Sequence, residues 1–126
     1  MASGIVHRDP LNCYGTLTSA DVVNSKLDLS DPNVTAFWLV RNGICFVRLS
    51  DIKTTQTSYS FGKVLTNLPP TSQGVYAHDL ESKVEFSIYP GDSSGDIYLK
   101  TNATFTVGAK LPHVTLSYPV DYSWYP

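Results

Sequence analysis

Residues 35–49 of this chain read TAFWLVRNGICFVRL. Two runs rich in β-branched and aromatic residues flank the pair Asn42-Gly43. Asn-Gly between such runs is the strongest short-range signal for a β-hairpin, because both residues tolerate the positive φ that a type I′ turn requires. The sequence therefore predicts two antiparallel strands, at 35–40 and 44–49.

Large apolar side chains occur on both predicted faces of this hairpin. We place Phe37 and Leu39 on one face with Cys45, Val47 and Leu49, and Trp38 and Val40 on the other with Phe46 and Arg48. Both faces are then expected to be covered, one by the core and the other by a neighbouring subunit. Trp38 is expected to lie in the core or in that subunit interface.

Short alternating runs continue along the rest of the chain. We expect further strands at 61–65, 75–77, 84–89, 97–99, 103–107 and 113–120, and a loop at 53–58. Gly62 inside the first of these runs indicates a β-bulge or a close backbone approach. Strands at this spacing, separated by turn signals and without a convincing amphipathic helix, build a sandwich or small barrel. The predicted fold class is all-β, an antiparallel β-sandwich or jelly-roll-like head with few or no helices.

The first part of the chain has weaker patterns. We expect an irregular N-terminal segment at 1–34 and a β-sandwich head at 35–126, within one compact domain of 126 residues. One short strand is possible within 11–17, and Ser19 is a candidate N-cap of a helical turn.

Composition excludes several classes of function. Charged residues make up 16% of the chain and the net charge is -2, so no electrostatic footprint for nucleic acid or an anionic membrane is present. No apolar run reaches the ~18 residues of a membrane-spanning helix, and residues 1–4 do not resemble a signal peptide. We expect no nucleic-acid partner, no membrane insertion and synthesis in the cytoplasm.

Cysteine usage points away from metal or disulfide chemistry. Cys13 and Cys45 are the only cysteines, and two thiols do not make a disulfide framework. No CxxC motif or Cys/His cluster suggests a metal site. Cys45 lies in an apolar strand, where a buried free thiol is expected. We predict no metal and no cofactor.

Enzymatic motifs are missing from the sequence. It contains no GxSxG, HExxH, P-loop or GxGxxG pattern, so we expect no enzyme and no catalytic residue. The only local cluster of histidine and acids is His78-Asp79 with Glu81, which we place in a loop between strands. Such a cluster could bind a sugar hydroxyl; a solvated loop is the alternative.

A saccharide site is the binding site that the remaining residues favour. Asp92 and Asp96 lie four apart in a Ser/Gly-rich turn; calcium would need more ligands than these, so a plain hairpin turn is preferred. Tyr122 and Trp124 belong to an aromatic C-terminal tail. Aromatic rings cover the apolar face of a sugar while carboxylates accept its hydroxyls. The predicted saccharide-binding residues are His78, Asp79, Glu81, Asp92, Asp96, Tyr122 and Trp124, although many tyrosines could instead form cross-strand pairs.

The order of these elements resembles a known family. The hairpin at 38–49 is followed by GKVLTNLPP at 62–70, a short strand, a Val-x-Phe-x-Ile strand, a Gly-Asp turn, Ile97-Tyr98-Leu99 and a closing VTLSYP at 114–119. This pattern over 37–119 resembles the C-terminal head domain of bacteriophage tail-fibre and receptor-binding proteins of phages of lactococci and related Gram-positive hosts. The resemblance implies a homotrimeric head at the virion tail tip, contacting other tail or baseplate proteins and binding a host cell-surface polysaccharide.

Four functional hypotheses follow. The first is a receptor-binding head that recognises a cell-surface saccharide without cleaving it. The alternative is a structural virion module, in a baseplate or as a capsid decoration, that makes only protein–protein contacts. A cellular lectin or carbohydrate-binding module would be expected to carry a catalytic domain or a signal sequence beside it. A depolymerising tail spike needs a longer parallel β-helix than 126 residues allow.

Overall fold

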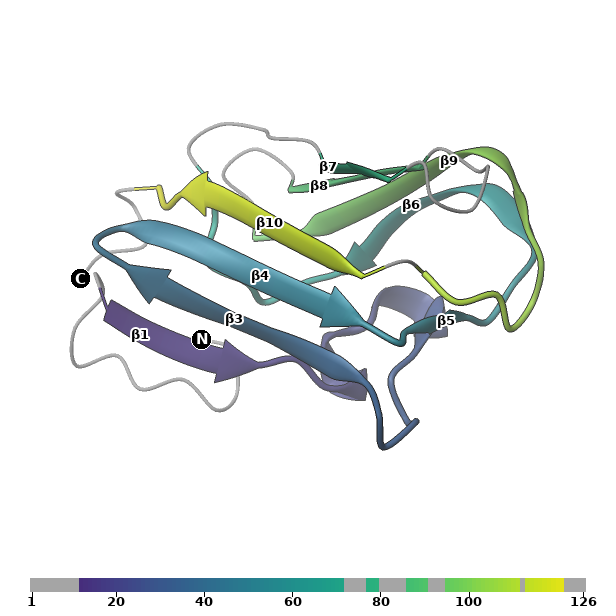
Figure 1. The fold of residues 1–126 in the computed structure, drawn as a ribbon, viewed down its shortest axis with the longest axis horizontal. Helices are drawn as coiled ribbons and strands as arrows, with labels where there is room; N and C mark the ends of the chain where they lie inside the picture. The colour runs from purple at the N-terminus through teal and green to yellow at the C-terminus, as the bar shows by residue number, and fades with distance from the viewer. Residues whose placement is uncertain (1–11, 72–76, 80–85, 91–94, 112, 122–126) are drawn as a thin grey trace.

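The chain folds into antiparallel β-sheets, as its sequence predicts (Figure 1). The computed structural model describes residues 12–71, 77–79, 86–90, 95–111 and 113–121. Within these ranges the only helices are two short 3₁₀ turns, η1 (Ser19–Asp21) and η2 (Val23–Ser25). The all-β class is therefore confirmed, while the jelly-roll topology and the trimer stay predictions.

The first sheet has four strands and contains the predicted hairpin. Its order is β1 (Asn12–Thr16), β3 (Thr35–Arg41), β4 (Ile44–Ser50) and β10 (Val114–Pro119). All neighbouring pairs are antiparallel. The division expected at residue 34 crosses this sheet, because β1 on one side of it pairs with β3 on the other.

The hairpin turn has the predicted geometry. Asn42 has a φ of 52° and Gly43 a φ of 78°, both positive as a type I′ turn demands. The two-residue turn makes Arg41 and Ile44 the first paired residues of the hairpin. This register fixes which side chains of β3 and β4 share a face.

The register corrects the face assignment made from the sequence. Val40 pairs with Cys45 and Trp38 with Val47. Directly paired residues lie on one face of a sheet, and a shift of one residue moves every side chain to the other face. Trp38 and Val40 therefore share the buried face with Cys45, Val47 and Leu49, whereas Phe37 and Leu39 share the other face with Phe46 and Arg48.

The second sheet lies beside the first and is less regular. Its order is β6 (Ser58–Leu65), β9 (Ile97–Phe105), β8 (Phe86–Pro90) and β7 (Ala77–Asp79). The register between β6 and β9 shifts between Ser60 and Gly62, and Gly62 has a φ of 64°, which confirms the predicted bulge. The strands expected at 97–99 and 103–107 are largely one continuous strand, β9.

Two small elements differ from the sequence prediction. β2 (Leu27–Asp28) pairs with β5 (Lys53–Thr54), so the loop expected at 53–58 begins with a short strand. The cap of η1 is Thr18 rather than Ser19. Thr18 and Asp21 form a reciprocal capping box, which satisfies two backbone donors at the start of the turn.

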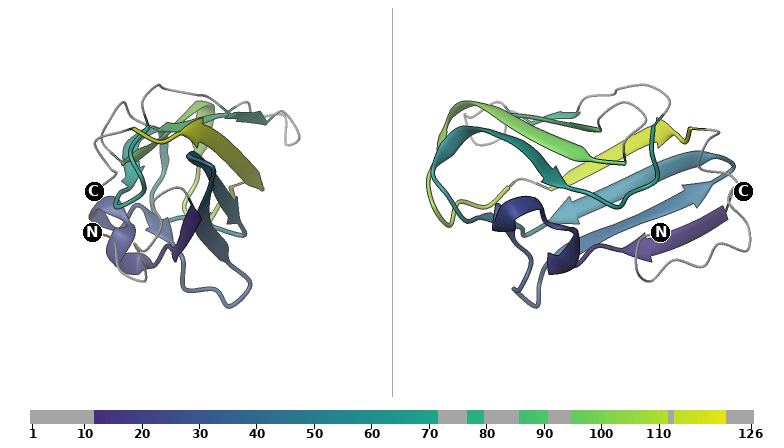
Figure 2. Two further views of the ribbon diagram at one scale, coloured as in Figure 1. Left: turned by 90° about the vertical axis from the view of Figure 1, so that its left-hand side faces the viewer. Right: turned by 180° about the vertical axis from the view of Figure 1, so that it is seen from behind.

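One hydrophobic core joins the two sheets. Figure 2 shows the arrangement of these sheets from two further directions. Trp38 is fully buried in this core, which is one of the two places expected for it, the other being a subunit interface. The Trp38 indole covers Gly15, its partner on β1: a Cβ atom at Gly15 would lie only 2.6 Å from two indole carbons. The absence of a side chain at Gly15 is thus what lets the large ring lie flat under the edge strand.

Two polar side chains fix irregular backbone to the core. The Lys26 ammonium donates to the carbonyl oxygens of Phe61 (2.6 Å) and Lys63 (2.9 Å), on either side of the Gly62 bulge. The buried Tyr118 hydroxyl of β10 donates to the carbonyl oxygen of Pro69 at 2.7 Å. Both contacts supply a side-chain donor to backbone carbonyl groups.

Candidate functional site

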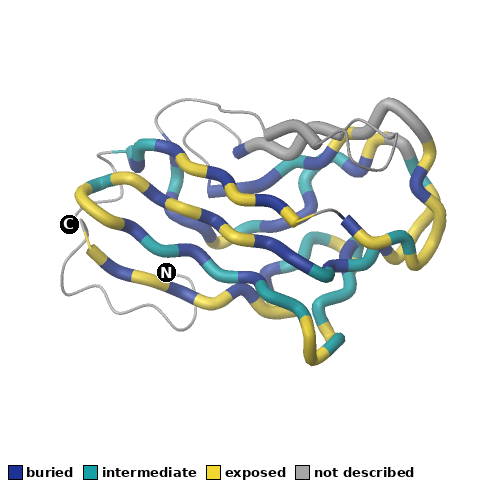
Figure 3. The backbone as a smooth tube through the Cα atoms, viewed as in Figure 1, coloured by how far each residue is buried: buried dark blue, intermediate teal, exposed yellow. Residues whose placement is uncertain are grey.

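The exposed face of the first sheet is the candidate functional surface. We call it the outer face, and it consists of Asn12, Tyr14 and Thr16 on β1, Thr35, Phe37, Leu39 and Arg41 on β3, Ile44, Phe46 and Arg48 on β4, and Thr115, Ser117 and Pro119 on β10. Figure 3 shows the alternation of buried and more exposed positions along these strands. The outer face is the side of the sheet that the core does not cover.

The strand pairing arranges the outer face in rows. The middle row runs across all four strands as Tyr14, Leu39, Phe46 and Ser117. Tyr14 is 61% exposed and Phe46 39% exposed, and Leu39 between them is half-buried. Cross-strand neighbours lie about 5 Å apart, so these apolar groups form one continuous strip.

Apolar groups also occupy the rows on either side. Ile44 is exposed in one flanking row and Phe37 is half-buried in the other. An antiparallel sheet with one face in water normally alternates apolar and polar residues cleanly. The β3–β4 hairpin departs from this pattern, because apolar side chains point to both sides of it.

The two charged groups of the outer face are both arginines. Arg41 lies in the row of Ile44, and Arg48 lies in the row of Phe37. Arg48 donates to the Thr115 hydroxyl at 3.5 Å, and Arg41 donates only to the adjacent Val40 carbonyl at 3.3 Å. Within the described ranges no carboxylate pairs with either guanidinium. The outer face therefore carries positive charge that no carboxylate of the described residues neutralises.

A second surface feature is a hollow beside the 3₁₀ turns. It measures about 290 Å³ and is lined by segments 17–19 and 27–30, which supply three leucines and four polar residues. The carboxylate of Asp28 accepts hydrogen bonds from the hydroxyl and the backbone N–H of Ser30, and these bonds lower the pKa of Asp28. The hollow thus combines apolar walls with an ionised carboxylate.

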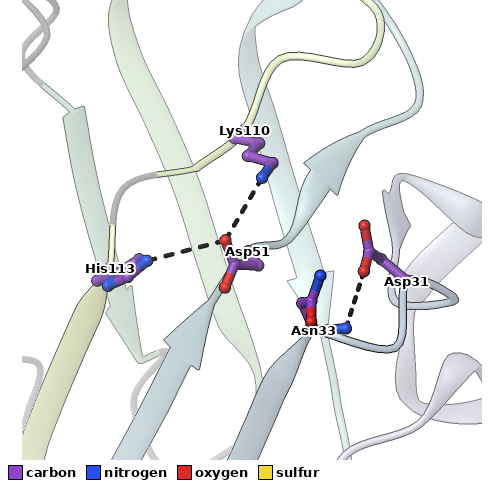
Figure 4. A network of polar contacts seen from close by, with 5 residues as sticks. All are labelled: Asp31, Asn33, Asp51, Lys110 and His113. Atoms are coloured by element: carbon purple, nitrogen blue, oxygen red, sulfur yellow. Dashed lines mark hydrogen bonds and ion pairs between the residues drawn. The ribbon is translucent and has the colours of Figure 1, made fainter.

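A polar network closes one end of the first sheet (Figure 4). Oδ1 of Asp51 lies 3.5 Å from Lys110 Nζ and 3.9 Å from His113 Nε2. Nearby, Asp31 accepts from the backbone N–H of Asn33 at 2.8 Å. Lys110 and His113 are both mostly exposed, and exposed pairs of this kind contribute little to stability. The network is therefore a surface contact beside the start of β10.

The predicted saccharide residues are not brought together among the described positions. His78 and Asp79 lie in strand β7, paired with Ser87 and Phe86, so their placement in a loop was wrong. The partner ladder comes from β8, which overlaps the strand expected at 84–89. The other predicted residues except Asp96 lie outside the described residues; they are Glu81, Asp92, Tyr122 and Trp124.

Asp96 is held by contacts within the chain. One carboxylate oxygen accepts from the Thr66 hydroxyl at 2.7 Å, and the other lies 3.2 Å from the Lys63 ammonium. The hydrogen bond and charge of Asp96 raise the pKa of Lys63. Asp96 is buried, so this arrangement gives its side chain a structural task at the start of β9.

Both cysteines are buried, and Cys45 is the buried free thiol that its place in an apolar strand predicts. Cys13 and Cys45 each pair with Val40 from opposite sides, which places their Cα atoms about 10 Å apart, beyond the reach of a disulfide. Burial raises the pKa of Cys45 to about 12. A thiol held protonated in this way is a poor nucleophile and a poor metal ligand.

The described residues contain no group of three or more potential metal ligands. They also contain no helix with the length and apolar character needed to span a membrane. No family model, curated protein or solved structure matches this chain.

Part of the outer face escaped sequence reasoning. Tyr14, Ile44 and Arg41 were not recognised as its members, although Phe37, Leu39 and Phe46 had been noted among the large apolar groups of the hairpin. The Asn-Gly turn was the signal available for Ile44 and Arg41, because a two-residue turn pairs them directly. Tyr14 joins them through the long-range pairing of β1 with β3, which no local pattern encodes.

Proposed function

We propose that this chain is a non-catalytic attachment module that joins a larger assembly by packing its outer face against another protein. The observation that carries the proposal is the strip of Tyr14, Leu39 and Phe46, which lies on three adjacent strands and faces away from the core. Single exposed apolar residues are ordinary on protein surfaces, whereas contiguous apolar patches mark interaction sites.

The shape and composition of the outer face favour a protein partner. Small ligands bind in concave sites, and a sheet face is broad and shallow by comparison. Tyrosine, phenylalanine and arginine are the residue types enriched at protein–protein interfaces, and the outer face carries all three. Among the sequence hypotheses, this function corresponds to the structural virion module, a role that the resemblance to phage tail proteins supports.

Removing an apolar group from the outer face tests the proposal. Phe46→Ser should leave the isolated chain folded, because Phe46 lies outside the core. In extracts of the cells that produce the chain, this variant should reduce the fraction of tagged chain that co-elutes in high-mass complexes. Val107→Ser is the matched control, because Val107 is 65% exposed and lies away from the first sheet. Equal co-elution of both variants with the unchanged chain would contradict the proposal.

Host adhesion through saccharide binding, in a trimeric virion head, is the second candidate function. The resemblance of residues 37–119 supports it, and so does the hollow at 17–19 and 27–30, whose mixed lining suits the apolar faces and hydroxyls of a sugar. Fluorescently tagged protein should then label whole Gram-positive cells, with competition by purified wall polysaccharide. Labelling should weaken in Asp28→Asn or Trp124→Ala, and a broad strain panel without labelling would contradict this function.

A further inference from the structure

The charge of the outer face carries information about its partner. Arg41 and Arg48 lie on opposite sides of the apolar middle row, on neighbouring strands. Ile44 is the partner of Arg41 and stands four residues before Arg48 on β4, so the two arginine positions are about 13 Å apart along the strands. The outer face thus has an apolar centre with one positive group at each side.

Neither arginine is neutralised by the described part of the chain. Every other member of the outer face is apolar or an uncharged polar residue. A guanidinium that is buried in an interface without a carboxylate carries a large desolvation penalty. A partner that covers the apolar centre must therefore also supply acceptors for both guanidinium groups.

This requirement argues against a second copy of the chain on the same face. A two-fold pairing uses the same surface on both subunits. Two outer faces packed together would bring four guanidinium groups and no carboxylate into one interface, and like charges across an interface are strongly unfavourable. A partner with carboxylates at its rim meets the arginines with short, charge-assisted hydrogen bonds instead.

We propose that the outer face docks an acidic protein surface, whose carboxylates meet Arg41 and Arg48 on either side of an apolar centre that covers Tyr14, Leu39 and Phe46. This inference rests on the proposed attachment function and names the chemistry of the partner. Fixed carboxylates about 13 Å apart suit the rigid spacing of the arginines along two neighbouring strands. An anionic membrane offers mobile charges and is the competing occupant that the test separates.

The test uses a yeast-displayed library of 16-residue peptides with alternating apolar positions and flanking positions randomised among Glu, Lys, Gln and Ser. Selection on the intact chain should enrich Glu over Lys at the flanking positions by about tenfold or more, because charge complementarity is worth at least this much at an interface. Arg41→Glu/Arg48→Glu should reverse the preference towards Lys. Lys100→Glu, an exposed charge change on β9, should leave it unaltered.

The other outcomes separate this inference from the function on which it rests. Peptides that bind through Phe46 with no preference between Glu and Lys would overturn the acidic partner and leave the attachment face in place. Peptides whose binding is unaffected by Phe46→Ser would overturn both. Self-association that depends on Phe46, measured by sedimentation, would assign the face to a second copy of the chain and refute the inference. Binding to vesicles of phosphatidylcholine and phosphatidylglycerol (3:1) that depends on the two arginines, without selection of any peptide, would assign the face to a membrane and refute it as well.

Discussion

The contact between Gly15 and Trp38 makes Gly15→Ala the sharpest test of the packing. A Cβ atom at position 15 would lie 2.6 Å from indole carbons Cε2 and Cζ2 and 2.8 Å from Nε1. Carbon atoms pack favourably at about 3.5–4.0 Å, so the ring or the strand must move by about 1 Å. Trp38 is fully buried and has no free space to move into without disturbing the core.

The expected cost follows from two opposing effects. Overpacking of a core costs about 1–3 kcal/mol, and replacing glycine by alanine returns about 0.4–1 kcal/mol by restricting the unfolded chain. The free energy of unfolding of Gly15→Ala should fall by about 1–2 kcal/mol. Urea unfolding followed by circular dichroism measures this directly, and a domain of this size should also lose about 3–10 °C in melting temperature.

A double-mutant cycle shows whether the indole ring is the cause. Trp38→Phe removes the atoms that would collide with the new Cβ, although the smaller ring itself leaves a cavity. The double variant should therefore lose at least about 0.5 kcal/mol less than the sum of the two single variants. Strict additivity, or a Gly15→Ala variant as stable as the unchanged chain, would refute the reasoning.

Three further predictions concern polar side chains that lie in or against the core. Lys26→Met keeps the aliphatic stem but removes two hydrogen bonds to the bulge carbonyls, so its free energy of unfolding in urea should fall by about 1–3 kcal/mol. The exposed control Lys110→Met should change the free energy of unfolding by less than about 0.5 kcal/mol. Equal effects of the two variants would contradict the role given to Lys26. Tyr118→Phe leaves the buried Pro69 carbonyl without its donor and should cost about 1–3 kcal/mol, whereas an unchanged unfolding midpoint would show that the bond adds nothing. Burial raises the pKa of the Cys45 thiol from 9.0 to about 12, so the unfolded chain loses this proton at lower pH than the folded chain does. The contribution of Cys45 to the free energy of unfolding is therefore fully present below pH 9 and falls by about 4 kcal/mol as the pH rises to 12. Urea titrations across this range should show a smaller fall in Cys45→Ala, and parallel curves would exclude the thiol as the cause.

Local signals in the sequence predicted much of the fold. The Asn42-Gly43 turn, the Gly62 bulge and the closing strand at β10 each follow from residues within a short window, and each is confirmed. The faces of the hairpin were assigned wrongly because the strands were read separately. The two-residue turn would have given the correct pairing of Val40 with Cys45.

Long-range pairing explains what the sequence could not supply. Thr66 and Lys63 lie about 30 residues from Asp96, so a carboxylate in a Ser/Gly-rich turn looked available for a ligand although both of its oxygens are engaged. In the same way, only the ladder between β1 and β3 brings Tyr14 beside Leu39. The candidate surface is a product of strand order, which alternation within single strands does not determine.

Site-specific photo-cross-linking tests the attachment face most directly. Phe46→p-benzoylphenylalanine places the cross-linker in the middle row, and Val107→p-benzoylphenylalanine places it at an exposed control position. In the cells that produce the chain, position 46 should yield a discrete adduct with one protein other than the chain itself, and position 107 should yield none. No adduct from position 46, or the same adducts from both positions, would contradict the assignment of the outer face as the docking surface.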